Sequence, residues 1–353
     1  MASKILFTDM NFNSDAESGF SGESTGADYP QYIGNCSYST CAEFIPQNNV
    51  FLSVLSVNSR SLRKNFFSLS QLLYSIPTRP NIIAITETWL QDGDEMYLAI
   101  PNYNFVSSPR PVGRGGGVGI YLEDNLDFSE VSYVKQLFNT HESISVEISR
   151  INGTNIIVTC LYRPPDTNAE QFNTEFELLL SSLKVKNKMF ILAGDYNLNL
   201  FNVHKDCHIS EYFNIAVSHG LYPTVTKPTR VTKSSATLID NVYVNILHYP
   251  IKSTIFLNDL SDHFPLFVEF SCMTKPHRPV RYHTKRCYDR TSIAHFSNLL
   301  EYYDWTEFNM RCSFETDTSK LYDEFFVIIS VMYNVAFPEM SQRQSKAGSS
   351  SHP

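Results

Sequence analysis

The sequence lacks the features that mark secreted and membrane proteins. Its seven cysteines are odd in number and scattered, which excludes the paired framework of a disulfide-rich secreted domain. The apolar run at residues 5–7 is too short for a signal peptide, and the longest such run, residues 325–333, is too short to span a membrane. We therefore expect an intracellular protein, nuclear or cytoplasmic, that is not secreted and has no membrane partner.

Charge is scarce as well, and basic charge is not in excess. Charged residues make up 18% of the 353 residues and the formal net charge is −8, which by itself argues against nucleic acid as a partner. However, residues 1–50 hold six acidic residues and one basic residue, so the other 303 residues carry a net charge of only −3. A local basic groove on the folded part is compatible with this composition.

The hydrophobic pattern predicts one large α/β domain between less ordered ends. Residues 1–47 are rich in Ser, Gly, Asn and Asp without a sustained period, so we expect a largely disordered segment. Residues 48–272 mix strand and helix signals in an order that favours mixed sheets. We expect a linker with two amphipathic helices over residues 273–338 and a disordered tail over 339–353. The predicted strands are residues 51–57, 81–85, 118–122, 143–148, 155–162, 189–193, 238–244 and 264–270, and the predicted helices are residues 62–76, 167–183, 209–219, 293–303 and 321–335.

Polar side chains stand at the ends of several predicted strands. Glu87 follows the strand at residues 81–85, and Asp195 and Asn197 follow the strand at residues 189–193. Hydrolysis of a phosphodiester needs an activated water and neutralised phosphoryl oxygens, and Mg²⁺ held by one or two carboxylates supplies the neutralisation. Glu87 is a candidate ligand. Asp195 is suited to orient or deprotonate the water, and Asn197 to donate an amide N–H to the phosphate.

Three further residues complete this set. Asn58 ends the first predicted strand and can orient the same site. His263 can hydrogen-bond a phosphoryl oxygen, and Asp240 is its natural partner because an unpaired carboxylate is costly in an apolar strand. Taken singly, each of these residues has an ordinary alternative as a solvated strand cap, a turn or a helix cap. Their order at successive strand ends is what favours a catalytic site.

These phrases make the chain resemble the endonuclease/exonuclease/phosphatase superfamily, which includes deoxyribonuclease I and the apurinic/apyrimidinic endonucleases. Within it, the closer likeness is to the endonuclease domain of LINE-type non-LTR retrotransposons. The phrases keep the family's order over about residues 50–271 and are specific when taken together. They are Val57-Asn58-Ser59-Arg60-Ser61-Leu62, Thr86-Glu87-Thr88-Trp89-Leu90, Arg114-Gly115-Gly116-Gly117-Val118, Leu161-Tyr162-Arg163-Pro164-Pro165, Gly194-Asp195-Tyr196-Asn197, Ser235-Ala236-Thr237-Leu238-Ile239-Asp240 and Ser261-Asp262-His263-Phe264-Pro265.

The resemblance implies a fold, a cofactor and a set of roles. The fold is a four-layer α/β/β/α sandwich like that of deoxyribonuclease I, with two packed mixed sheets flanked by helices and a metal-dependent site at one edge. The cofactor is Mg²⁺, with Mn²⁺ as an alternative. Whether His263 acts as a base or stabilises the phosphate stays open. By motif position, Asn58, Glu87 and Asp262 belong to the metal site, and the catalytic residues are Tyr162, Asp195, Asn197, Asp240 and His263.

DNA is the partner that the resemblance implies, whereas no protein partner or oligomeric state can be read from the sequence. The implied function is nicking of DNA by a retrotransposon-derived endonuclease without a reverse transcriptase part, since no Tyr-Ala-Asp-Asp signature follows. Arg60 departs from the apurinic branch, which has an acidic residue there, and suits the retrotransposon branch. The basic loop residues suited to a DNA backbone are Arg60, Arg114, Arg163, Lys227 and Arg230, although each is also compatible with ordinary solvated charge.

Two other functions fit part of the pattern. A phosphatase or phosphodiesterase of the same fold that acts on inositol phosphates or lipids would share Ser261-Asp262-His263. The inositol phosphatases, however, typically have an arginine near the Gly-Asp-x-Asn segment, where this chain has Leu198-Asn199-Leu200. The third interpretation is a catalytically inactive remnant that serves as a binding module. All candidate site residues are present, so the motifs themselves show no decay.

Overall fold

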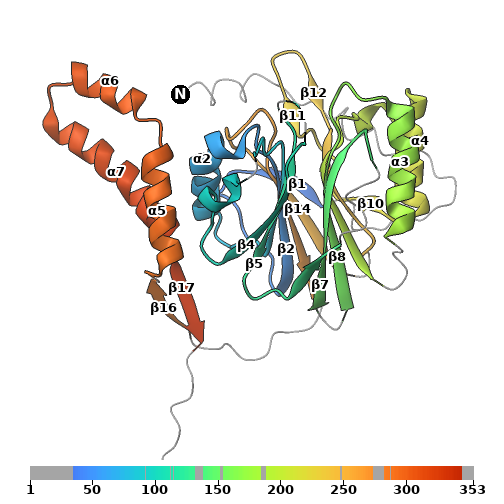
Figure 1. The fold of residues 1–353 in the computed structure, drawn as a ribbon, viewed down its shortest axis with the longest axis horizontal. Coiled ribbons are helices and arrows are strands. Elements are labelled where there is room, and N and C mark those ends of the chain that lie inside the picture. Colours follow the sequence, from blue (N-terminus) through green and yellow to red (C-terminus); the bar gives the residue numbers. More distant parts are fainter. Residues whose placement is uncertain are drawn as a thin grey trace, which may run out of the picture.

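A computed structural model describes residues 35–343 of the chain, except residues 92, 112, 114, 132–137, 152–153, 184–187, 247–248, 273–281 and 287. Two large sheets form its centre (Figure 1). The seven-stranded sheet has the order β1 (Cys36–Ser39), β14 (Ile251–Phe256), β15 (Leu266–Ser271), β2 (Val50–Asn58), β3 (Ile82–Thr86), β5 (Val118–Glu123) and β4 (Tyr103–Ser108). The six-stranded sheet has the order β10 (Tyr222–Pro223), β13 (Asp240–Val244), β9 (Met189–Asp195), β8 (Thr154–Tyr162), β7 (Glu142–Ile151) and β6 (Phe128–Glu130).

Helices and two short ribbons complete the described part of the chain. The ribbons pair β11 (Arg230–Val231) with β12 (Ala236–Thr237) and β16 (Tyr282–Arg286) with β17 (Glu339–Arg343). The α-helices are α2 (Leu62–Ser75), α3 (Ala169–Ser182), α4 (Cys207–Ser218), α5 (Arg290–Tyr302), α6 (Thr306–Phe314) and α7 (Thr318–Ala336). Among these described helices, none combines the length and the apolar character needed to cross a membrane.

Alternating side chains of the strands build three apolar layers. In β2, Leu52 and Val54 face the other sheet and pack against β8 and β9, whereas Leu55 and Val57 face outward and pack against α2. The outer face of the six-stranded sheet is covered by α3 and α4 (Figure 1). The order helix, sheet, sheet, helix is the four-layer sandwich that the motifs predicted, and the mixed sheets are confirmed.

Strand direction brings residues that are distant in sequence to one rim of the sandwich. β2 and β3 run parallel and end together, with Asn58 paired to Thr86. β8 and β9 also run parallel, with Tyr162 paired to Asp195 at their ends. The antiparallel strand β13 begins at the same place, with Asp240 opposite Asp195. The carboxyl ends of four strands and the start of a fifth therefore meet at one edge.

Gly194 is required for the close pairing of β8 and β9. It lies opposite Leu161 in the register, and a Cβ added at this position would overlap the Leu161 carbonyl oxygen. A larger residue would push the two strands apart. The distance between Tyr162 and Asp195, one residue further along each strand, depends on this glycine.

The ends of the domain differ from the boundaries that composition predicted. Residues 36–39 form β1, which pairs in parallel with β14, and Phe44 is buried in the core. The segment up to residue 47, which was predicted to be largely disordered, therefore has an ordered part from residue 36 onward. Residues 1–34 lie outside the described residues. Likewise, residues 339–343 form β17 instead of the beginning of a disordered tail. A four-residue strand in a polar segment carries too weak a periodicity to be detected.

The C-terminal helices pack against α2, which covers the outer side of the seven-stranded sheet (Figure 1). Leu299 of α5 and Met332 of α7 are buried in the same cluster as Phe66 of α2. The imidazole of His295 lies against the Phe66 ring, with 5.3 Å between their centroids. The two predicted amphipathic helices correspond to α5 and α7, and α6 between them was not predicted. The helical segment is thus joined to the layer that carries α2.

We expect the substitution Leu299→Ala to destabilise the protein by about 2–4 kcal/mol, because it leaves a cavity between α5 and α2. Leu299 is 2% exposed, whereas Ile293 on the same helix is 51% exposed and provides the matched control. Ile293→Ala should change the free energy of unfolding by less than about 0.5 kcal/mol. Urea unfolding followed by circular dichroism measures both. Equal losses for the two variants would contradict this packing.

Candidate active site

The amide of Asn58 connects two carboxylates at the rim. Its Nδ2 atom donates to Oε1 of Glu87 at 2.9 Å and to Oδ2 of Asp195 at 2.8 Å. Its Oδ1 atom accepts the backbone N–H of Arg60 at 3.2 Å, which fixes the orientation of the amide. Asn58 was predicted to belong to the metal site. In this arrangement it faces the carboxylates with its nitrogen, so it orients them, and its oxygen is turned to the Arg60 backbone and not to a metal ion.

Glu87 is held by neutral donors on both carboxylate oxygens. Oε1 accepts from Asn58, and Oε2 accepts the indole N–H of Trp89 at 3.1 Å. Each oxygen keeps a further lone pair for a cation. Because Glu87 and Asp195 share one donor nitrogen, their nearest oxygens are separated by at most the sum of two hydrogen-bond lengths. The sequence predicted Glu87 as a metal ligand, and this geometry is suited to that role.

His263 and Asp240 form a buried pair. The Nδ1 atom of His263 lies 2.9 Å and 3.0 Å from the two carboxylate oxygens of Asp240, and the two residues are 4% and 5% exposed. Thr229 completes this arrangement, because its hydroxyl donates to Oδ2 of Asp240 at 2.7 Å. The same hydroxyl accepts the backbone N–H groups of Ile239 and Asp240. With Nδ1 engaged, Nε2 is the atom of His263 that is left for a substrate or a proton.

Asp195 lies between these two groups and is fully buried. Its Oδ2 is 3.8 Å from Nδ1 of His263, and its Oδ1 accepts the backbone N–H of Asn197 at 3.0 Å. Burial and the neighbouring Asp240 carboxylate raise the pKa of Asp195, although His263 and the hydrogen bonds oppose this. Burial lowers the pKa of His263, but the carboxylates led by Asp240 outweigh it, so the pKa of His263 is raised.

Three carboxylates thus meet at the rim, and a cation would suit them. The hydrogen-bond donors to Glu87, Asp195 and Asp240 include four neutral groups: an amide, an indole N–H, a backbone N–H and a hydroxyl. Ligand atoms of Asp195, Asp240 and His263 also lie within 4.8 Å of one another, which is a geometry able to hold a metal ion. Nδ1 of His263 is already bonded to Asp240. A cation therefore fits better on the side of Asp195 that faces Glu87 than on the side that faces His263.

The backbone around the site is unusually strained. Seven described non-glycine residues have positive φ, and five of them lie at this rim. Left-handed conformations are costly for residues with a Cβ and persist where surrounding contacts enforce them, commonly at functional sites. The five are Arg60 (41°), Ser61 (87°), Glu87 (51°), Trp89 (53°) and Asn197 (47°).

Asp262 has other partners than the predicted metal ion. Its Oδ1 accepts from Arg60 at 2.8 Å, and its Oδ2 lies 2.7 Å from a terminal nitrogen of Arg230. Burial opposes ionisation of Asp262, but the hydrogen bonds from these two guanidinium groups prevail and lower its pKa. Two cations surround one carboxylate, so this group of three residues presents net positive charge. Asp262 serves here to hold two arginines at the rim.

Tyr162 ends β8 beside Asp195 and is 5% exposed. Burial, together with the charges of Glu87 and Asp195, raises the pKa of Tyr162, so its phenol stays a neutral hydroxyl that can donate a hydrogen bond. The guanidinium of Arg110 lies over the Tyr162 ring, 5.9 Å from the centroid. The predicted contact of Tyr162 with a phosphate is compatible with this position.

Arg163 and Asn197 connect two loops of the site. The Asn197 amide donates to the Arg163 carbonyl at 2.8 Å. The Arg163 side chain is only 3% exposed and donates to the carbonyls of Tyr196, Asn197 and Thr167. The buried guanidinium therefore holds these loops together. The prediction that Arg163 contacts a DNA backbone is wrong, because the side chain has a structural role. Sequence alone could not distinguish an inward from an outward arginine in a loop.

Of the other predicted basic residues, two lie together at the rim. Arg60 and Arg230 are 48% and 38% exposed in their side chains and lie together through Asp262. Lys227 lies beside Cys36 of β1, at the edge strand of the seven-stranded sheet. Arg114 lies outside the described residues. Arg60 and Arg230 are the two that the structure brings together with the carboxylate site.

Sequence reasoning missed three residues that support the site. Thr229 holds Asp240, and Trp89 holds Glu87. The Ser261 hydroxyl donates to the Asn58 carbonyl at 2.7 Å and accepts the His263 backbone N–H at 3.1 Å. Trp89 and Ser261 stand inside recognisable motifs, so their position was a signal. Thr229 stands in an irregular segment whose closeness to Asp240 appears only in three dimensions.

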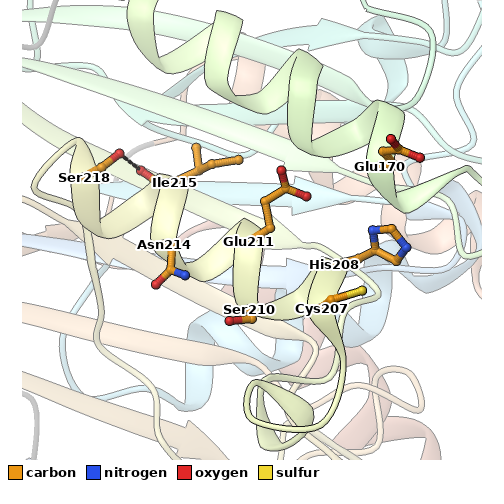
Figure 2. Close-up of a pocket in the computed structure, with 8 residues that line it drawn as sticks. All are labelled: Glu170, Cys207, His208, Ser210, Glu211, Asn214, Ile215 and Ser218. Atoms are coloured by element: carbon orange, nitrogen blue, oxygen red, sulfur yellow. Dashed lines mark hydrogen bonds between the residues drawn. The ribbon is translucent and has the colours of Figure 1, made fainter.

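A separate hollow of about 660 Å³ lies on the helical layer, between α3 and α4. Figure 2 shows Glu170, Cys207, His208 and Glu211 around it. Among the described residues, only Asp195, Asp240 and His263 bring three ligand atoms close enough together to hold a metal ion. The residues around this hollow do not form such a cluster. It takes no part in the arrangement at the rim.

Comparisons with known proteins agree with this fold. A model of the endonuclease/exonuclease/phosphatase family matches residues 55–263, whereas no curated protein matches the chain. The structure is similar to the endonuclease domain of TRAS1, a telomere-specific non-LTR retrotransposon, with a TM-score of 0.50, 16% identity and coverage of 63% of this chain and 99% of that one. It is also similar to an AP endonuclease from Archaeoglobus fulgidus, with a TM-score of 0.48, 15% identity and coverage of 63% and 100%. At these identities the likeness shows the fold alone.

We expect Thr229→Val to lower the free energy of unfolding by about 1–3 kcal/mol, because it leaves two backbone N–H groups and one Asp240 oxygen without their partner. Valine keeps the shape of the side chain, so the loss reports the hydroxyl. Thr229→Ser retains the hydroxyl and is the matched control, with a smaller loss. Urea unfolding of both variants is the measurement. A serine variant as unstable as the valine variant would show that the hydroxyl is not the cause.

Proposed function

The chain belongs to the endonuclease/exonuclease/phosphatase family, as its motifs predicted, and on this premise we propose that it is a metal-dependent phosphodiesterase that nicks DNA. The observation that carries the proposal is the convergence of Glu87, Asp195 and His263 around the Asn58 amide and the Asp240 carboxylate. A carboxylate, a base and an imidazole within one rim are what hydrolysis of a phosphodiester requires.

A divalent cation fits the Glu87 side of the site, where it would neutralise charge on the phosphoryl oxygens. Glu87 would hold it, and Asn58 keeps the Glu87 and Asp195 carboxylates oriented towards it. We propose Mg²⁺ as this cation, with Mn²⁺ as the alternative, because carboxylate oxygens are ligands that both prefer.

The roles of the remaining residues follow from their protonation. Asp195, whose pKa is raised, is a stronger base than an ordinary carboxylate and suits removal of a proton from the attacking water. His263, whose pKa is also raised, suits donation of a hydrogen bond from Nε2 to a phosphoryl oxygen as the imidazolium. The neutral Tyr162 hydroxyl can donate to the same phosphate. These assignments favour His263 as the group that stabilises the phosphate.

DNA is the substrate that we propose, for two reasons. Arg60 and Arg230 place net positive charge beside the carboxylate site, where a phosphate backbone would pass. The phrases around Glu87 and Asp262 resemble those of retrotransposon endonucleases, and this resemblance supports such an origin for the chain.

We expect the full chain to convert supercoiled plasmid to open circles with Mg²⁺ and to lose this activity in EDTA. Asp195→Asn should reduce the nicking rate by about 10²–10⁴-fold, because it removes the base that orients the water. Asp206→Asn is the matched control, since Asp206 caps α4 and asparagine also caps helices. An Asp195→Asn variant within tenfold of the wild type would contradict the assignment. Phosphate release from inositol polyphosphates without nicking would favour a phosphatase instead.

We expect Arg230→Gln to weaken DNA binding and to reduce the slope of log affinity against log salt concentration by about one, because one phosphate contact is lost. Arg311→Gln is the control, since Arg311 is a half-exposed arginine of α6, away from the rim. Fluorescence anisotropy of a labelled duplex at several salt concentrations gives both slopes. An unchanged slope for Arg230→Gln would remove this residue from the proposed DNA surface.

A further inference from the structure

A cleft adjoins the candidate active site on the side of the glycine run. It has a volume of about 800 Å³, and its lining includes Trp89, Leu90, Pro109, Arg110 and Pro111. This size falls within the range of roughly 300–1,000 Å³ that is usual for pockets that bind small molecules. Trp89 belongs to the cleft and to the site at once, because its indole N–H donates to Glu87 at 3.1 Å while its side chain lines the cleft.

The walls of this cleft are fixed by the backbone of the glycine run. The backbone N–H of Trp89 donates to the Gly116 carbonyl at 2.8 Å, and that of Thr88 donates to the Gly117 carbonyl at 3.1 Å. Both glycines have positive φ, and a Cβ at Gly116 would overlap the Arg110 guanidinium. The loop therefore closes tightly on Trp89 and Arg110, and the cleft is formed before any ligand arrives.

Among the described lining residues, the charge of the cleft is balanced. Arg110 is the one charged residue among the described lining residues, and its Nε donates to the Glu142 carboxylate. The backbone N–H of Gly117 donates to the second oxygen of Glu142, which holds the acid in place. With the Arg110 cation paired, the described walls of the cleft suit a planar, mainly apolar ring with polar edges.

We propose that this cleft holds one nucleobase beside the scissile phosphate, with Trp89 as its aromatic wall. The inference rests on the proposed function, because the divalent cation that Glu87 would hold is what would place the phosphate. A base in a duplex must leave the stack to enter such a cleft, so unpaired DNA fits best. Trp89 is also a positioning residue, because its N–H fixes Glu87. Through Trp89, a base bound in the cleft would therefore affect the orientation of Glu87.

The two tryptophans of the chain make the proposal directly testable. Trp305 packs against Tyr303 and Phe325 in the C-terminal helices, so Trp305→Phe leaves Trp89 as the single tryptophan. With Mg²⁺ present and Asp195→Asn added to suppress cutting, an oligothymidylate should quench the emission of Trp89. An oligonucleotide of equal length made only of abasic sugars has the same phosphates and should not quench. It should also bind at least about fivefold more weakly, as expected for one lost stacking contact.

Two substitutions separate the two roles of Trp89. Trp89→Phe keeps an aromatic ring but loses the N–H, so the preference for bases should persist while the affinity for Mg²⁺, measured by calorimetric titration, falls by about tenfold or more. Trp89→Leu should lose the preference for bases as well. Equal binding of both oligonucleotides by a protein that nicks plasmid would overturn the cleft proposal and leave the function standing. Failure to bind either oligonucleotide or to nick plasmid would reject the function, and this inference with it.

Discussion

The site depends on one side chain that joins the two sheets. Asn58 ends a strand of the seven-stranded sheet, and its amide donates both to Glu87 in the same sheet and to Asp195 in the other. Without a donor between them, two acidic groups at this spacing would repel each other. The amide therefore links the two sheets of the sandwich. It also holds the two carboxylates of the candidate active site close together.

Around this link, local strain and local support occur together. Glu87 and Trp89 both have left-handed backbones, and the chain holds them by hydrogen bonds from Ser61 to the Glu87 carbonyl and from Trp89 to the Gly116 carbonyl. Such conformations oppose the preferences of individual residues, and a folded protein sustains them where the surrounding structure over-determines them. The strained residues coincide with those that face the carboxylate cluster, which sets this rim apart from the rest of the described molecule.

Much of this arrangement was predictable because strand periodicity and strand-end chemistry are local in sequence. Glu87 and Asp195 each follow an apolar strand, and His263 precedes one that runs antiparallel to β2, so these strand directions bring all three residues to one edge. Contacts that depend on long-range geometry were not predictable. Arg163 turns inward because three carbonyls surround it, and Thr229 reaches Asp240 from an irregular segment. Neither fact leaves a trace in residue type or spacing.

The pairing of β1 with β14 has a practical consequence for work on this protein. β1 covers the outer edge of β14, which would otherwise present free backbone N–H and C=O groups to solvent. Uncovered edges of this kind recruit strands from other molecules and promote aggregation. A recombinant fragment trimmed to begin at residue 48, as composition alone would suggest, would lose β1, so expression of the isolated sandwich should start upstream of Cys36.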